Sequence, residues 1–184
     1  MRLFAASQVL LALACTLQGC RQTEEPRSPS PGAPPEVGQL APEIEGEDMD
    51  GVSFKLSDYR GKVVVLDFTG HWCPWCVKMY PDVVKLVERH AEEPFAFLAI
   101  NTDDDREKAN RINHRQGYNW RSWWDGGIGG PISTRWGVGG YPTLYVLDAK
   151  GVIRYAWEGY VPARVLNGAV DTLLREVADG GKRS

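Results

Sequence analysis

Apolar positions along the chain predict five strands. Two nearly continuous apolar runs, residues 63–68 and 95–100, are typical of strands that are buried on both faces. Residues 52–56 alternate apolar and polar side chains after a turn pair, which predicts a strand or one arm of a hairpin. Residues 144–147 and 152–157, which a polar turn joins, predict the last two strands.

Helical spacing appears between and after these strands. Apolar side chains recur every three or four positions over residues 77–91, a charged helix is expected over residues 103–116, and Pro162 opens a final helix with one apolar face. Strands and helices thus alternate before a closing hairpin and helix. This order predicts an α/β fold, a thioredoxin-like three-layer sandwich in which helices flank a mixed central β-sheet, as the motifs discussed below also indicate.

The N-terminal residues follow a different pattern. Arg2 precedes an uncharged stretch of the length found in the apolar core of a secretory signal, and the stretch ends in Leu17-Gln18-Gly19-Cys20. This ending resembles a bacterial lipoprotein box, in which the cysteine is lipidated and becomes the new N-terminus. We therefore expect a signal peptide over residues 1–19 and lipidation at Cys20. The alternative is a plain secretory signal in which Cys20 is incidental.

Residues 20–38 contain five prolines together with serines, and they lack apolar periodicity. They predict a disordered tether, which would join a domain of residues 39–180 to a membrane of the cell envelope, on the periplasmic side. The chain has no apolar run of roughly 20 residues, so a polytopic membrane protein is excluded.

Composition narrows the classes of function. A net charge of −3 argues against a nucleic-acid partner, which requires clustered positive charge. Apolar residues make up 43% and charged residues 24%, which are values of a globular protein, and a monomer is expected. Four cysteines are too few for a scaffold built on disulfides, so their positions are more informative than their number.

Two of these cysteines lie three positions apart in Trp72-Cys73-Pro74-Trp75-Cys76, between a buried strand and a helix. At this spacing both lie on one helical face, close enough to form a disulfide. Cys73 is expected to be exposed at the helix N-terminus, where free N–H groups and the helix dipole favour its thiolate. Cys76 is expected to be more buried and to resolve the mixed disulfide that Cys73 forms.

Two other interpretations of this cysteine pair were weighed on the same residues. A structural zinc site needs four ligands, but the chain has no second cysteine pair and its three histidines lack ligand spacing, so no metal is predicted. A purely structural disulfide would also form in an oxidising compartment. It does not explain why the pair lies at a helix start between two tryptophans.

The cysteine motif and its surroundings resemble a known superfamily. Residues 64–76 resemble the active-site strand and helix start of thioredoxins. Residues 56–62 resemble the lead-in of the TlpA/ResA-like branch, whose members are exported and often membrane-anchored, and residues 137–148 resemble its cis-proline loop and the following strand. The resemblance covers about residues 40–177. It implies a thioredoxin fold in which the cysteine pair is the redox centre and no organic cofactor is needed.

The resemblance also implies roles for single residues. Asp67 matches a buried acid that takes a proton from Cys76; the alternative is an aspartate turned to solvent at a strand end. Pro142 matches a cis-proline that faces the disulfide and exposes the backbone of Tyr141 to an extended substrate, and Pro81 matches a proline that kinks the active-site helix. The residues expected to contact substrate are Trp72, Pro74, Trp75, Tyr141 and Pro142.

The chain departs from the superfamily around its cysteines. Trp75, between them, cannot supply the positive charge that stabilises a thiolate, which favours the reducing end of the superfamily's range of potentials. His71 is a candidate replacement, although a position on the rim of the site is more common for such a histidine. The tryptophan-rich segment 119–136 is interpreted as a strand and a short helix packed on the core, with a polypeptide-docking surface as the alternative.

These features predict a lipid-anchored thiol–disulfide oxidoreductase that reduces exported proteins. Expected partners are oxidised protein substrates, apocytochrome c among them, and a membrane protein that donates electrons, since the chain has no dinucleotide motif. A thiol peroxidase is the first alternative, but Thr69 stands four rather than three residues before Cys73. A copper-binding chaperone is the second, although such relatives usually separate their cysteines by three residues.

Overall fold

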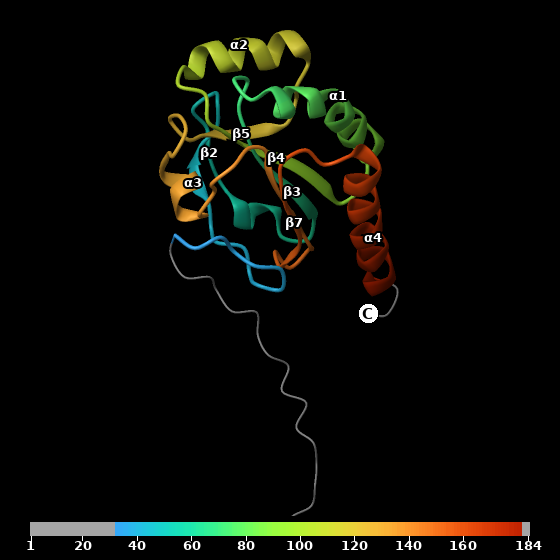
Figure 1. The fold of residues 1–184 in the computed structure, drawn as a ribbon. Helices are drawn as coiled ribbons and strands as arrows, with labels where there is room; N and C mark the ends of the chain where they lie inside the picture. Colours follow the sequence, from blue (N-terminus) through green and yellow to red (C-terminus); the bar gives the residue numbers. More distant parts are fainter. Residues whose placement is uncertain (1–31, 182–184) are drawn as a thin grey trace, which may run out of the picture.

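The computed structural model describes residues 32–181, so the predicted signal peptide and Cys20 lie outside the described residues. Figure 1 shows the helices and strands in chain order. They are β1 (Glu45–Glu47), β2 (Ser53–Lys55), η1 (Leu56–Tyr59), β3 (Val63–Thr69), α1 (Pro74–Arg89), β4 (Phe95–Asn101), α2 (Arg106–Gln116), β5 (Arg121–Trp124), α3 (Pro131–Arg135), β6 (Thr143–Leu147), β7 (Ile153–Glu158) and α4 (Ala163–Gly181).

The central sheet has the strand order β5-β4-β3-β6-β7. Strands β3, β4 and β5 are parallel, because α1 and α2 carry the chain back between them. Strand β6 runs antiparallel to β3, and the hairpin partner β7 runs antiparallel to β6. The predicted mixed sheet flanked by helices is therefore confirmed.

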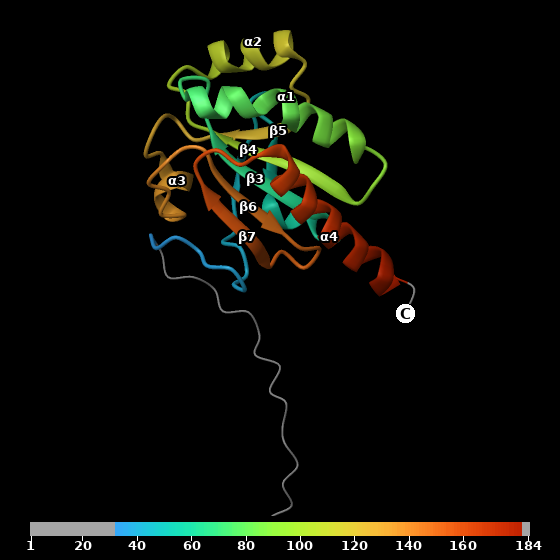
Figure 2. The same ribbon diagram turned by 45° about the vertical axis from the view of Figure 1, so that its right-hand side comes forward.

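Strand β3 lies in the middle of the sheet and is buried at every position. Val63 and Val65 pack into a core with residues of α1 and α4, the two helices that cover one face (Figure 2). Val64, Leu66 and Phe68 pack into a second core with residues of β2, η1 and β5. Alternate side chains of a strand point to opposite faces, so two cores explain the unbroken apolar run.

The tryptophan-rich segment belongs to the second core. Trp123 of β5 is fully buried and stacks on Phe54, with ring centroids 3.9 Å apart. After β5, the carboxylate of Asp125 accepts hydrogen bonds from the N–H groups of Ile132 (2.7 Å) and Ser133 (2.8 Å), which caps α3. The interpretation as a strand and a short helix packed on the core is confirmed.

The described residues that precede the predicted domain boundary lie against the domain. The N–H of Gly32 donates to the carbonyl of Arg135 (3.3 Å), that of Gly38 donates to the carbonyl of Ile153 (2.8 Å), and Pro35 is buried. The packed part of the chain therefore begins before residue 39, because backbone hydrogen bonds hold a segment that lacks apolar periodicity. Within residues 32–181, no helix combines the length and apolar character needed to cross a bilayer.

Candidate active site

A short turn joins β3 to α1 and carries the first cysteine. The N–H of Cys73 donates to the carbonyl of Gly70 (3.1 Å), and Cys73 is the N-cap of α1. Its sulfur accepts a hydrogen bond from the N–H of Cys76 (3.2 Å), one turn into the helix. The two sulfurs form a disulfide, with Cα atoms 5.3 Å apart. The sequence-predicted pair is thus joined, at the helix start where it was expected.

The disulfide is buried, and the expectation that Cys73 is exposed is wrong. Cys73 is 2% exposed and Cys76 is fully buried. Both pack against Tyr80, one helical turn beyond Cys76, and the partly buried rings of Tyr118 and Trp120 close the cluster. Aromatic side chains from other elements therefore cover a helix start that would be open in α1 alone.

Exposed aromatic side chains surround the buried disulfide. Trp72 is 43% exposed and its ring meets that of Tyr141 edge-on, with centroids 5.1 Å apart. Trp75 is 53% exposed and packs against Tyr160 at 5.8 Å, and the ammonium group of Lys78 lies 4.8 Å from both of these rings. A partner that reaches the disulfide thus meets an apolar surface edged by one cation.

Two of the predicted substrate-contact residues precede β6. The peptide bond between Tyr141 and Pro142 is cis, as expected. Pro142 itself is buried, whereas Tyr141 packs against the cysteine cluster. Pro74 is exposed at the first position of α1, between the two cysteines. The structure therefore brings Trp72, Tyr141 and the cysteines together, while the roles of these residues toward substrate stay predictions.

Asp67 is a buried carboxyl group in β3. It shares a sheet face with Val63 and Val65, the face that α1 covers, and its Oδ1 has no hydrogen-bond partner. Burial raises the pKa of Asp67 from 3.8 to about 7, although a hydrogen bond with Thr69 lowers it. The alternative of an aspartate turned to solvent is wrong, because Asp67 is buried. Its role as proton acceptor for Cys76 stays a prediction.

His71 is mostly buried, not on the rim, with a side chain 13% exposed. Its Nδ1 lies 2.7 Å from Oδ2 of Asp103, and its backbone N–H donates to the same carboxylate (3.0 Å). Asp103 comes from the loop after β4, outside α2, although the sequence predicted it as the start of that helix. Helix α2 begins at Arg106 because Asp105 is its N-cap.

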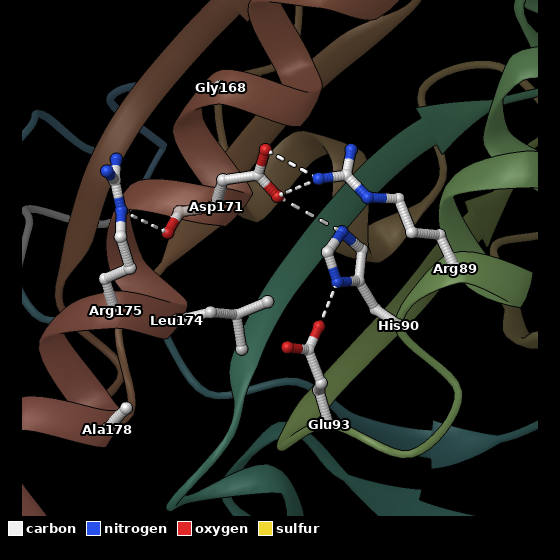
Figure 3. A pocket seen from close by; sticks show the side chains of 8 residues that line it. All are labelled: Arg89, His90, Glu93, Gly168, Asp171, Leu174, Arg175 and Ala178. Carbon is white, nitrogen blue, oxygen red and sulfur yellow. Dashed lines mark hydrogen bonds and ion pairs between the residues drawn. The ribbon is translucent and has the colours of Figure 1, made fainter.

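A separate pocket lies at the far end of α1, where α1 meets α4 (Figure 3). Arg89 donates to both carboxylate oxygens of Asp171 (2.9 Å each), and buried His90 contacts Glu93 and Asp171. The charged groups that carry these contacts therefore pair with one another. The cysteines lie at the opposite end of the same helix, which is roughly 20 Å long at 1.5 Å per residue.

A mixed sheet that delivers a disulfide-bonded cysteine pair to the start of a helix, beside a cis-proline loop, defines a thioredoxin-fold protein of thiol–disulfide exchange. Residues 37–156 match the AhpC/TSA family, and the chain belongs to that family.

Relatives and solved structures agree with this class. The chain is 29% identical over 118 residues to the thiol-disulfide oxidoreductase ResA of Geobacillus thermodenitrificans, which covers 64% of this chain and 67% of that protein. It is 30% identical over 131 residues to the thiol:disulfide interchange protein DsbE of Vibrio cholerae, covering 70% and 68%. The crystal structure of a DsbF homologue from Corynebacterium diphtheriae superposes with a TM-score of 0.66 at 28% identity, covering 75% and 90%.

Sequence reasoning missed the residues that shape the site from a distance. Tyrosine and tryptophan after a polar helix, or a lysine in an amphipathic one, give no local signal of the site they join. The residues found only in the structure are Lys78, Tyr80, Asp103, Tyr118, Trp120 and Tyr160.

Proposed function

We propose that this chain is an extracytoplasmic reductase of protein disulfides, with the Cys73–Cys76 pair as its redox centre and no organic cofactor. The observation that carries the proposal is the disulfide at the first turn of α1, whose free N–H groups and dipole favour a thiolate at Cys73. The ResA and DsbE relatives are named for thiol–disulfide chemistry, and one structural neighbour at 25% identity is a secreted isomerase from Corynebacterium glutamicum.

Each reaction cycle moves two electrons from the cysteine pair to the substrate. The reduced Cys73 thiolate attacks one sulfur of a substrate disulfide, which forms a mixed disulfide and releases the other substrate sulfur as a thiolate. Cys76 then loses its proton to Asp67 and attacks Cys73, which releases the second substrate thiolate and restores the Cys73–Cys76 disulfide. A membrane protein that donates electrons would reduce the pair again.

The aromatic surface around the disulfide supports a polypeptide substrate. Trp72 and Trp75 expose apolar area beside the redox pair, and the backbone of Tyr141 is placed to pair with an extended segment. Apocytochrome c, whose haem cysteines must be reduced, is one such substrate. We propose that lipidation at Cys20 holds the protein, as a monomer, to a membrane of the cell envelope.

The test is reduction of insulin disulfides by the purified protein, with dithiothreitol as electron source. Cys73→Ser should abolish the reaction, and Cys76→Ser should accumulate a mixed disulfide at Cys73 because the resolving thiol is absent. Insulin reduction that survives Cys73→Ser would refute the assignment. Peroxide consumption that depends on Cys73, without insulin reduction, would favour a peroxidase instead.

A further inference from the structure

The pair formed by His71 and Asp103 lies directly beside the redox centre. His71 belongs to the turn that the Cys73 N–H closes onto Gly70, so two residues separate the imidazole from the attacking sulfur along the chain. Its ring meets that of Tyr80 at 5.9 Å, and Tyr80 packs against both cysteines. The imidazole therefore touches the same aromatic layer that covers the disulfide.

Asp103 fixes the orientation of this imidazole. Its carboxylate accepts from the backbone N–H of His71 and contacts Nδ1, and it accepts a further hydrogen bond from the side chain of Asn101 (2.8 Å). Burial alone would raise the pKa of Asp103, but the hydrogen bonds from His71 and Asn101 hold it below its usual value. Asp103 is thus an anion at neutral pH, bonded to one nitrogen of the ring.

The other nitrogen, Nε2, is buried and has no hydrogen-bond partner in the described chain. A ring held through Nδ1 by a carboxylate is favoured as the protonated imidazolium, because the anion offsets its charge. The buried thiolate of reduced Cys73 needs a nearby positive charge, and no residue between the two cysteines supplies one. His71 is therefore the charge-bearing partner on the page that is nearest to Cys73 in the sequence.

We propose that His71, oriented by Asp103, stabilises the Cys73 thiolate and so sets the redox potential of the cysteine pair. This inference rests on the proposed function and names a positioning and charge-tuning residue for it. When Cys73 is reduced, the imidazolium and the thiolate form a neutral pair beside the turn. Oxidation to the disulfide removes the thiolate, and the imidazolium keeps only its Asp103 partner.

Other charged groups face His71 less closely. Asp104, Asp105 and Lys108 line a cavity of about 510 Å³ with the imidazole, and all three are exposed, so water screens them. From the protein interior, Tyr80 presents its ring, and burial raises the pKa of its hydroxyl, which therefore stays neutral. Asp103 is accordingly the dominant charge on this histidine.

His71→Gln tests the proposal, because glutamine keeps a donor for Asp103 but carries no charge. Thiolate absorbance should show the Cys73 thiol ionising at a higher pH than in the unmodified protein. The equilibrium constant with glutathione should shift toward the disulfide by at least threefold, which is about 14 mV for a two-electron couple. His114→Gln, which removes an exposed histidine from α2, is the matched control and should change neither value.

A double-mutant cycle separates charge from structure. In the unmodified protein, Asp103→Asn removes the anion that supports the imidazolium, so Cys73 should ionise at a higher pH. In the His71→Gln background the same change removes a lone negative charge near the sulfur, so Cys73 should ionise at a lower pH. A structural role of Asp103 predicts the same sign in both backgrounds, and that result would overturn the proposal.

One measurement requires no variant. Coupling between two sites is reciprocal, so the His71 ring resonances should titrate at a higher pH in the reduced protein than in the oxidised protein. Identical titration in both forms, or a folded His71→Gln protein with an unchanged glutathione equilibrium, would reject the role of His71. A protein that fails to reduce insulin at all would instead reject the proposed function, so the two failures are distinguishable.

Discussion

Replacing the buried acid of β3 gives a stability change whose sign depends on pH. Asp67→Asn is expected to stabilise the oxidised protein at pH 8 and to leave its stability nearly unchanged at pH 4. Burial raises the pKa of Asp67 to about 7, and its Oδ1 has no hydrogen-bond partner to compensate for the lost hydration. Above pH 7 the folded protein therefore holds an unfavourable buried carboxylate, which asparagine removes.

The magnitude follows from the two pKa values of this one group. Between pH 3.8 and about 7 the folded protein keeps a proton on Asp67 that the unfolded chain has released. The free energy of unfolding therefore decreases as the pH rises through this window and is constant above it. The gap corresponds to about 4 kcal/mol at ~1.4 kcal/mol per pH unit, an upper bound because the asparagine amide is also a buried polar group.

Urea unfolding of the oxidised protein at pH 4, 5, 6, 7 and 8 provides the measurement. The difference in unfolding free energy between Asp67→Asn and the unmodified protein should grow from pH 4 to pH 7 and then level off. Asp82→Asn, which changes an exposed acid of α1, is the control and should give a small, nearly constant difference. A constant difference for Asp67→Asn across this range would show that Asp67 does not titrate near pH 7.

Two further stability predictions concern packing and backbone. Trp123→Ala should lower the free energy of unfolding by about 3–5 kcal/mol in urea, because the ring is fully buried and stacked on Phe54; little change would mean that the second core does not form as described. Gly168→Ala in α4 should raise it by about 0.5–1 kcal/mol, since the added Cβ meets open space, whereas Gly130→Ala should lower it because its Cβ would lie 1.8 Å from the carbonyl oxygen of Asp125.

The fold could be predicted because its signals are local. A strand buried on both faces needs an apolar side chain at nearly every position, and β3 shows this with a single exception, Asp67, before Thr69 ends the strand. Two cysteines three positions apart at the end of such a strand also specify the helix that follows. The strand and helix of the tryptophan-rich segment were placed for a similar reason, because large apolar rings favour burial in a core.

The environment of the cysteines could not be predicted, because it depends on contacts between distant segments. Tyr118 and Trp120 follow α2 and close over the disulfide only after the sheet has assembled, so the burial of Cys73 has no local signal. His71 and Asp103 lie 32 residues apart and meet because β3 and β4 are neighbours in register, Thr69 beside Asn101. Sequence alone suggested a helical Asp103 and a rim histidine.

The placement of two acids relative to one aromatic side chain links the stability and the chemistry of the site. Tyr80 packs on both cysteines, and besides burial, the charges of Asp67 and Asp103 raise its pKa. Both acids therefore act on the region where a thiolate forms, but only Asp103 has a cationic partner. Below about pH 7 Asp67 is neutral and adds no repulsion to the thiolate. Above that pH a second anion accumulates beneath α1, so the charge on His71 becomes more important for keeping Cys73 reactive as the pH rises.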